Sequence, residues 1–161
     1  ANMFNLSAGY NFYKPLSNTW FAAIQTDGMI TLPFKQAYIN KRALGYNENY
    51  LRGLELYVVD GVAMGLTRLS LKKKLFQLDV SLLKKSKYLN HIPISVYGLA
   101  FNDWGYVYQE EKNVTGLNNR LLRTAGLGIE VLSLYDFNVR MGYGFNQLNT
   151  NGFFIHIYNG F

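Results

Sequence analysis

Side chains that could carry out catalysis are few in this chain of 161 residues, and they lie far apart in the sequence. The chain has no cysteine, so neither a disulfide nor a thiolate metal site can form, and its two histidines, His91 and His156, are widely separated. The sequence also lacks a Ser/His/Asp constellation, a paired-carboxylate motif and a phosphate-binding glycine loop. We therefore expect no enzyme active site, no metal site and no cofactor.

Basic residues outnumber acidic residues by 16 to 10, which gives a formal net charge of +6. Clusters of basic residues can bind nucleic acid or anionic lipid head groups. The favoured interpretation is a solvated turn between two long strands that rests on lipid phosphates, with no nucleic-acid partner. The lysines concerned are Lys72, Lys73, Lys74, Lys84, Lys85 and Lys87.

The elements that must position any functional side chain are indicated by alternating apolar and polar residues, the period of a β-strand with one buried or lipid-facing side. The clearest run lies at 136–145, where Phe137, Val139, Met141, Tyr143 and Phe145 share one face. The segments 4–12, 124–131 and 153–157 show the same alternation. Runs of about nine to eleven residues suit a tilted strand that crosses a bilayer, whereas ordinary globular strands hold about five or six.

Seven strands are predicted, and together they favour an all-β fold: a transmembrane antiparallel β-barrel in a single domain over residues 1–161. Short turns alternate with longer loops, as in barrels with periplasmic turns and extracellular loops. Aromatic residues make up 16% of the chain, which suits rings at both membrane interfaces. An aromatic-rich soluble β-sandwich is the alternative. The predicted strands are 3–13, 19–31, 61–76, 94–108, 121–134, 136–147 and 152–161, and the longest loop is at about 32–60.

An odd number of strands is unusual for a bacterial barrel, and an open sheet in lipid leaves backbone groups of its edges unpaired. Either a further strand lies within 36–57, or the chain is part of a larger barrel. No signal peptide is visible, and Ala1 leads almost directly into a strand, as in a mature chain or in a fragment of a longer one.

Three short motifs occur in a fixed order along the chain. Leu-Arg-Gly-Leu at 51–54 lies in the long loop, Phe-Asn-Asp-Trp-Gly at 101–105 lies in the fourth strand, and Gly-Leu-Gly-Ile at 126–129 precedes an aromatic C-terminus. In this order and spacing the chain resembles the C-terminal half of the outer-membrane protein assembly family, the BamA and TamA type of surface-antigen barrel, in a Bacteroidota-like form. The seven strands match the tenth to sixteenth strands of that barrel, so the resemblance covers nearly the whole chain.

The resemblance implies that the 32–60 loop folds back into the barrel lumen. Its tip in the family is Val/Ile-Arg-Gly-Phe, which this chain matches at Arg52 and Gly53, with leucine at both apolar positions. The arginine docks on a wall motif, Phe-x-Asp-x-Gly, which Phe101, Asp103 and Gly105 match in full. Strand parity agrees, because it places Phe101 and Asp103 on one face, where the carboxylate needs a partner and the ring can stack on the guanidinium.

One departure from the family concerns a second lumen acid, whose matching position here is Ser70. Arg52 is therefore expected to depend on Asp103 alone. Glu130 and Arg140 also point inward on neighbouring predicted strands, and we expect them to form a structural ion pair.

The resemblance further implies a non-enzymatic insertase that helps unfolded β-barrel proteins enter the bacterial outer membrane, through a weak seam between the first and last strands. Its expected partners are the outer-membrane lipid bilayer, unfolded β-barrel clients and periplasmic or lipoprotein subunits. Gly152 at the start of the last strand is expected to weaken the seam. The opposite face of this segment is expected to serve as the chain's own C-terminal recognition signal, through Phe153, Ile155, Ile157 and Phe161.

Other functions remain open at this point. Within the same family, the chain could belong to a polypeptide-secretion transporter or to the barrel anchor of a patatin-like lipase. From another class, it could be a passive porin or adhesin barrel, which should conduct ions steadily through a lumen rich in unpaired charges.

Overall fold

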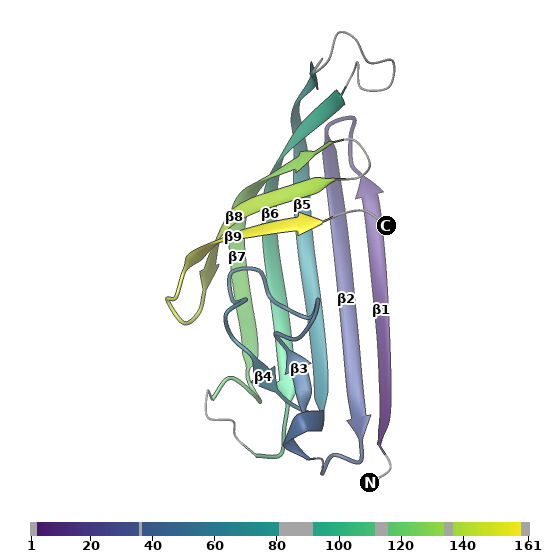
Figure 1. Cartoon of the computed structure of the whole chain (residues 1–161), viewed down its shortest axis with the longest axis vertical. Helices are drawn as coiled ribbons and strands as arrows, with labels where there is room; N and C mark the ends of the chain where they lie inside the picture. Colours follow the sequence, from purple (N-terminus) through teal and green to yellow (C-terminus); the bar gives the residue numbers. More distant parts are fainter. Residues whose placement is uncertain (1–2, 36, 81–91, 112–115, 134–136, 159–161) are drawn as a thin grey trace.

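The computed structural model describes residues 3–35, 37–80, 92–111, 116–133 and 137–158. Seven long strands form one antiparallel sheet in the order β1-β2-β5-β6-β7-β8-β9 (Figure 1). The strands are β1 (Phe4–Pro15), β2 (Trp20–Leu32), β5 (Ala63–Val80), β6 (Ile92–Tyr108), β7 (Leu121–Leu132), β8 (Asn138–Asn146) and β9 (Gly152–Tyr158).

The all-β, antiparallel class predicted from the alternation is confirmed, and each of the seven predicted strands has a counterpart in the sheet. In the described residues β1 and β9 form the two edges of this sheet, and no ladder joins them. The predicted strand ends at 134, 136 and 159–161 fall outside the described residues. The described part of the chain contains no helix with the length and apolarity needed to cross a membrane.

Residues 33–62 connect β2 to β5 and lie against one face of the sheet, in front of its lower half in Figure 1. We call them the inner loop, and the sheet face that they contact the inner face. The inner loop contains a 3-10 helix, Tyr38–Asn40, and two short strands, β3 (Arg42–Leu44) and β4 (Val59–Asp60). Because β3 and β4 pair only with each other, the suggestion of an eighth wall strand within 36–57 is wrong.

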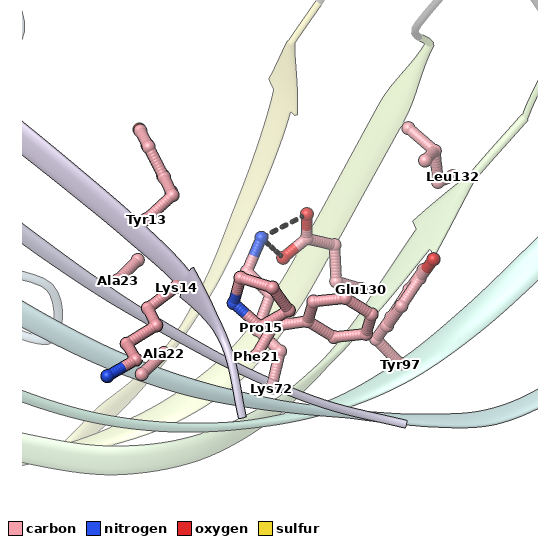
Figure 2. Close-up of a pocket in the computed structure, with 10 residues that line it drawn as sticks. All are labelled: Tyr13, Lys14, Pro15, Phe21, Ala22, Ala23, Lys72, Tyr97, Glu130 and Leu132. Carbon is pink, nitrogen blue, oxygen red and sulfur yellow. Dashed lines mark hydrogen bonds and ion pairs between the residues drawn. The ribbon is translucent and has the colours of Figure 1, made fainter. Parts of the chain in front are cut away.

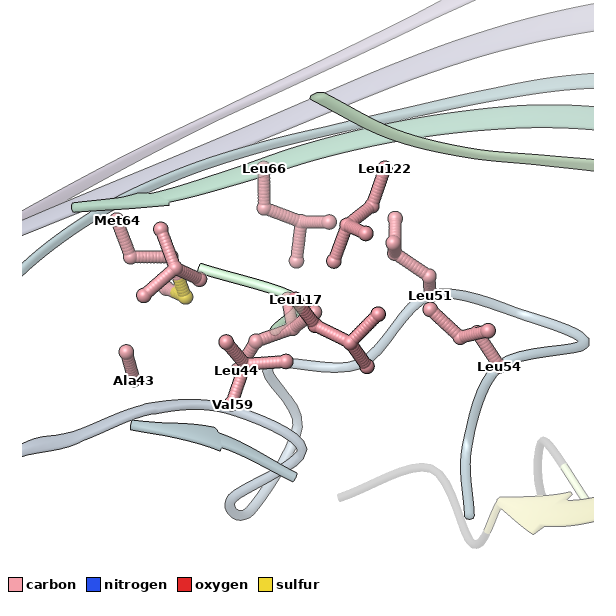
Figure 3. Close-up of a cluster of buried hydrophobic side chains, with 10 residues drawn as sticks. Ala43, Leu44, Leu51, Leu54, Val59, Met64, Leu66, Leu117 and Leu122 are labelled. Carbon is pink, nitrogen blue, oxygen red and sulfur yellow. The ribbon is translucent and has the colours of Figure 1, made fainter. Parts of the chain in front are cut away.

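Apolar side chains fix the inner loop on the sheet. Leu51 and Leu54 of the loop pack with Leu66 of β5 and Leu122 of β7, and all four are at most 3% exposed (Figure 3). Full burial of each such side chain contributes roughly 1.5–3 kcal/mol, so this cluster gives the loop a fixed place. The other members are Ala43, Leu44, Val59, Met64, Val107 and Leu117.

The two faces of the sheet differ in the way that strand alternation predicts. In the second half of β6, Phe101, Asp103 and Val107 are buried on the inner face, while Trp104 and Tyr106 are exposed on the outer face. In β1 the outer side chains include Phe4, Leu6 and Phe12, whereas the inner ones include Asn5, Ser7 and Asn11.

The interpretation of the lysine cluster as a solvated turn is wrong for its first three members. Lys72, Lys73 and Lys74 lie inside β5, which continues to Val80. Alternation sends Lys72 to the inner face, while Lys73 lies on the outer face with its ammonium 5.2 Å from the ring centre of Trp20. The other members of the cluster, Lys84, Lys85 and Lys87, fall outside the described residues.

Candidate functional site

The tip of the inner loop places Arg52 directly on Asp103 of β6. Nε of Arg52 donates to Oδ2 of Asp103 at 2.8 Å, Nη2 donates to Oδ1, and the backbone N–H of Arg52 donates to Oδ2 at 3.1 Å. The side chains are 3% and 0% exposed, respectively. A buried carboxylate with three donors is strongly held, because charge-assisted and bidentate hydrogen bonds are the strongest available to it.

The guanidinium of Arg52 also contacts β5 and an aromatic ring. Nη1 donates to the hydroxyl of Ser70 at 2.8 Å, and Nη2 donates to the carbonyl of Leu69 at 3.0 Å. The guanidinium carbon also lies 4.5 Å from the ring centre of Phe101, within cation–π range. The expectation that Arg52 depends on Asp103 alone is therefore wrong. We call these contacts of Arg52 with Asp103, Ser70, Leu69 and Phe101 the arginine lock.

Gly53 is needed next to Arg52 for two reasons. Its φ of +81° lies in the left-handed region, and a Cβ there would approach within 2.8 Å of the Cα of Gly144 in β8. The side-chain amide of Asn146 donates to the Gly53 carbonyl at 2.8 Å. Gly105 leaves room for Leu51, because a Cβ there would lie 3.1 Å from Cδ1 of Leu51. The structure thus brings the five predicted lock residues, Arg52, Gly53, Phe101, Asp103 and Gly105, into one site.

A further hydrogen bond joins the two sides of the inner loop near the β3–β4 pair, which we call the loop stem. The hydroxyl of Tyr46 donates to Oδ1 of Asp60 at 2.6 Å. This bond to a carboxylate, helped by partial burial, raises the pKa of Tyr46 to about 12. The raised pKa extends to higher pH the range over which the neutral phenol can donate this hydrogen bond.

A second ionic cluster surrounds Glu130 of β7 on the inner face. The predicted partner Arg140 lies 3.2 Å from Oε2 of Glu130. Lys72 contacts the same carboxylate at 2.7 Å, and the amide of Asn138 donates to it at 2.5 Å. The pair predicted from the sequence is present, but the lysine from β5 was missed.

Two neighbouring cavities adjoin this cluster. One, of about 340 Å³, has mainly apolar walls that include Phe21 and Tyr97, with the Lys72–Glu130 ion pair at its side (Figure 2). The other, of about 320 Å³, is polar and reaches from Lys72 to Arg52 and Arg68. Within the described ranges, no three His, Cys, Asp or Glu side chains lie close enough together to hold a metal ion.

The residues predicted for the seam lie along the edge strand β9. Phe153, Ile155 and Ile157 are 85%, 65% and 63% exposed on the outer face, and Gly152 is the first residue of the strand. Phe161 falls outside the described residues. Sequence reasoning missed the inner face of β9, where Phe154 is buried and His156 binds Glu55 of the inner loop at 2.9 Å.

Comparisons of the chain with protein-family models, with curated proteins and with solved structures found no match. Proposals about function therefore rest on the arrangement of the residues themselves and on the resemblance of the motifs.

Proposed function

We propose that this chain is part of a bacterial outer-membrane β-barrel of the BamA and TamA type, which helps unfolded β-barrel proteins enter the membrane. Further strands would close its sheet into a barrel of about sixteen strands, because an open edge in lipid leaves N–H and C=O groups without partners. The described edges β1 and β9 are the strands that such closure would involve.

The character of the outer face supports a lipid environment. Large apolar side chains are exposed on all seven strands, including Leu6 at 56%, Leu127 at 66% and Phe153 at 85%. Soluble monomers rarely expose contiguous apolar patches of more than a few hundred Å². Five of the seven strands hold 12 to 18 residues, which is enough to cross a bilayer at a tilt.

The observation that carries the proposal is the arginine lock. A buried ion pair holds a long loop against the inner face of a sheet whose outer face exposes many large apolar side chains. Such a pair costs desolvation energy and contributes little net stability, so a registering or switching role is the better reason for it. In a closed barrel, a loop held in this way would occupy part of the interior, which favours an insertase over an open pore.

The test uses the full-length protein reconstituted in lipid vesicles, with an unfolded β-barrel client added in urea and folded client measured by gel shift. We expect faster client folding with the wild type than with empty vesicles, and a loss of that gain with Asp103→Asn. The matched control is Asp27→Asn, which breaks the more exposed Arg68–Asp27 pair on the same face. We expect it to keep the gain.

Three results would contradict the proposal. Client folding at the rate of empty vesicles would refute insertase activity. Steady ion conductance by the wild type would favour a passive porin instead. Export of a polypeptide, or lipase activity on the vesicles, would favour the secretion transporter or the patatin-like lipase anchor.

A further inference from the structure

A continuous series of side-chain contacts leads from the arginine lock to the edge strand β9 and back to the inner loop. The guanidinium of Arg52 lies over Phe101, whose ring meets Phe154 edge-on with centres 5.4 Å apart. Phe154 stacks with His156 at 5.1 Å and an angle of 28°. The imidazole Nε2 of His156 then lies 2.9 Å from a carboxylate oxygen of Glu55, three positions after Arg52. The series therefore closes into a ring.

The neighbouring strands leave room for this series. A Cβ on Gly126 of β7 would lie 2.5 Å from Cζ of Phe101, and a Cβ on Gly142 of β8 would lie 2.5 Å from Cζ of Phe154. Each ring thus occupies a space that only glycine leaves open. Both rings are 5% exposed, so they form a buried bridge across the inner face from β6 to β9.

The contacts matter because β9 has a ladder on one side only in the described residues, and its other edge would form the weak seam of the proposed barrel. Its ladder to β8 runs from the Gly144–Gly152 pair to the Asn138–Tyr158 pair, and in the described residues its other edge has no strand partner. An edge strand with a single ladder is the part of a sheet that opens most readily. The contact of His156 with Glu55 therefore gives β9 an attachment to the inner loop in addition to its ladder with β8.

We propose that Phe154, His156 and Glu55 couple the arginine lock to β9, so that β9 stays paired with β8 while the lock is closed and loosens when the lock opens. Phe154 and His156 act as positioning residues that transmit the position of the loop tip to the edge of the sheet. Tyr50 supports the same arrangement from the loop, because its ring centre lies 5.0 Å from that of His156.

This inference rests on the proposed function and deepens it, because it concerns the same loop. Its test needs no unfolded client protein. Amide hydrogen exchange of β9 reports how often the strand opens, with no client present. Failure of the vesicle assay leaves the coupling standing, and uncoupled exchange leaves insertase activity standing.

The first experiment is a double-mutant cycle on the full-length protein in detergent micelles. Arg52→Gln opens the lock, and we expect it to raise the exchange rate of the β9 amides about tenfold, equivalent to roughly 1.4 kcal/mol. In the Phe154→Leu background, which removes the ring but keeps apolar volume, the same change should add less than about threefold.

The matched control is Phe153→Leu, the same substitution at the adjacent position on the outer face. It also removes an aromatic contact, to Tyr143 at 4.9 Å, but it does not touch the series. In this background the tenfold effect of Arg52→Gln should persist. Unchanged β9 exchange on opening the lock, or an equal increase in the Phe154→Leu background, would overturn the coupling.

The second experiment restores the coupling by a covalent bond. These 161 residues contain no cysteine, so Glu55→Cys and His156→Cys can be joined by a short bis-maleimide once any cysteine elsewhere in the full-length protein is replaced by serine. With the cross-link in place, Arg52→Gln should no longer raise β9 exchange. If the cross-linked variant exchanges as fast as the unlinked one, the proposal is wrong. Asp103→Asn replaces Arg52→Gln throughout if the latter fails to fold.

Discussion

Replacing Asp103 by asparagine should undock the inner loop from the sheet. The carboxylate accepts three hydrogen bonds from Arg52 and is fully buried, so the amide leaves a buried guanidinium without its counter-charge. Breaking a buried pair in this way costs about 3–5 kcal/mol. The contacts to Ser70 and Leu69 remain, but both are neutral acceptors.

The full test is a cycle of Arg52→Met, Asp103→Leu and the double variant. Each single change removes one charge and leaves the other charge buried without its partner. The double change removes both charges, so no unpaired charge stays buried. We therefore expect the double variant to be less destabilised than either single variant. The control pair is Arg68–Asp27, whose side chains are 11% and 25% exposed, and whose coupling should stay below about 1 kcal/mol.

The assay is amide hydrogen exchange of residues 37–62 of the inner loop in the full-length protein. Exchange rates convert to a free energy of loop opening, and each tenfold increase corresponds to about 1.4 kcal/mol. Additive effects in the Arg52–Asp103 cycle, or a coupling no larger than in the control cycle, would refute the reasoning.

Three further predictions concern other parts of the molecule. Gly53→Ala should undock the loop as Asp103→Asn does, because the alanine Cβ would meet Gly144 and the φ of this position is positive. Amide exchange of the inner loop measures the undocking, and an exchange rate equal to that of the wild type would contradict it. Because the pKa of Tyr46 rises from 10.0 to about 12 on folding, its bond to Asp60 stabilises the loop stem fully below pH 10 and is lost as the pH approaches 12. Tyr46→Phe should remove that alkaline step from the pH dependence of loop exchange, and an unchanged step would rule out this bond as its cause. Ile129→Arg, on the outer face of β7, should cost roughly 2–4 kcal/mol in a folding titration in vesicles, whereas a cost within about 0.5 kcal/mol would indicate a water-exposed surface.

The strands were predictable because alternation leaves a local record in the sequence. In β1 the outer residues Leu6 and Tyr10 alternate with the inner Ser7 and Asn11, and this pattern depends only on neighbouring positions. The contacts of Arg52 with Asp103 and Phe101 could be predicted because the two motifs resemble a known family and because parity places Asp103 inward. The contacts with Ser70 and Leu69 could not.

Other contacts leave no local record. Three consecutive lysines hide the alternation of β5, and the partner of Lys72, Glu130, is 58 positions away. His156 is even farther, 101 positions, from Glu55, and nothing near either residue marks the pairing. The close approach of Gly53 to Gly144 depends on where the loop tip meets β8, which only the fold of the whole sheet determines.

The most direct test of a lipid-facing sheet uses the chain's two tryptophans, Trp20 and Trp104. Both lie on the outer face, 38% and 45% exposed, and the strand register separates them by about 20 Å along the sheet. Their fluorescence is measured in the reconstituted protein, with any tryptophan outside these 161 residues replaced by phenylalanine, using brominated phospholipids and, separately, aqueous iodide. We expect brominated lipid to quench both tryptophans and iodide to quench neither strongly. Quenching of both by iodide and of neither by brominated lipid would contradict a membrane wall.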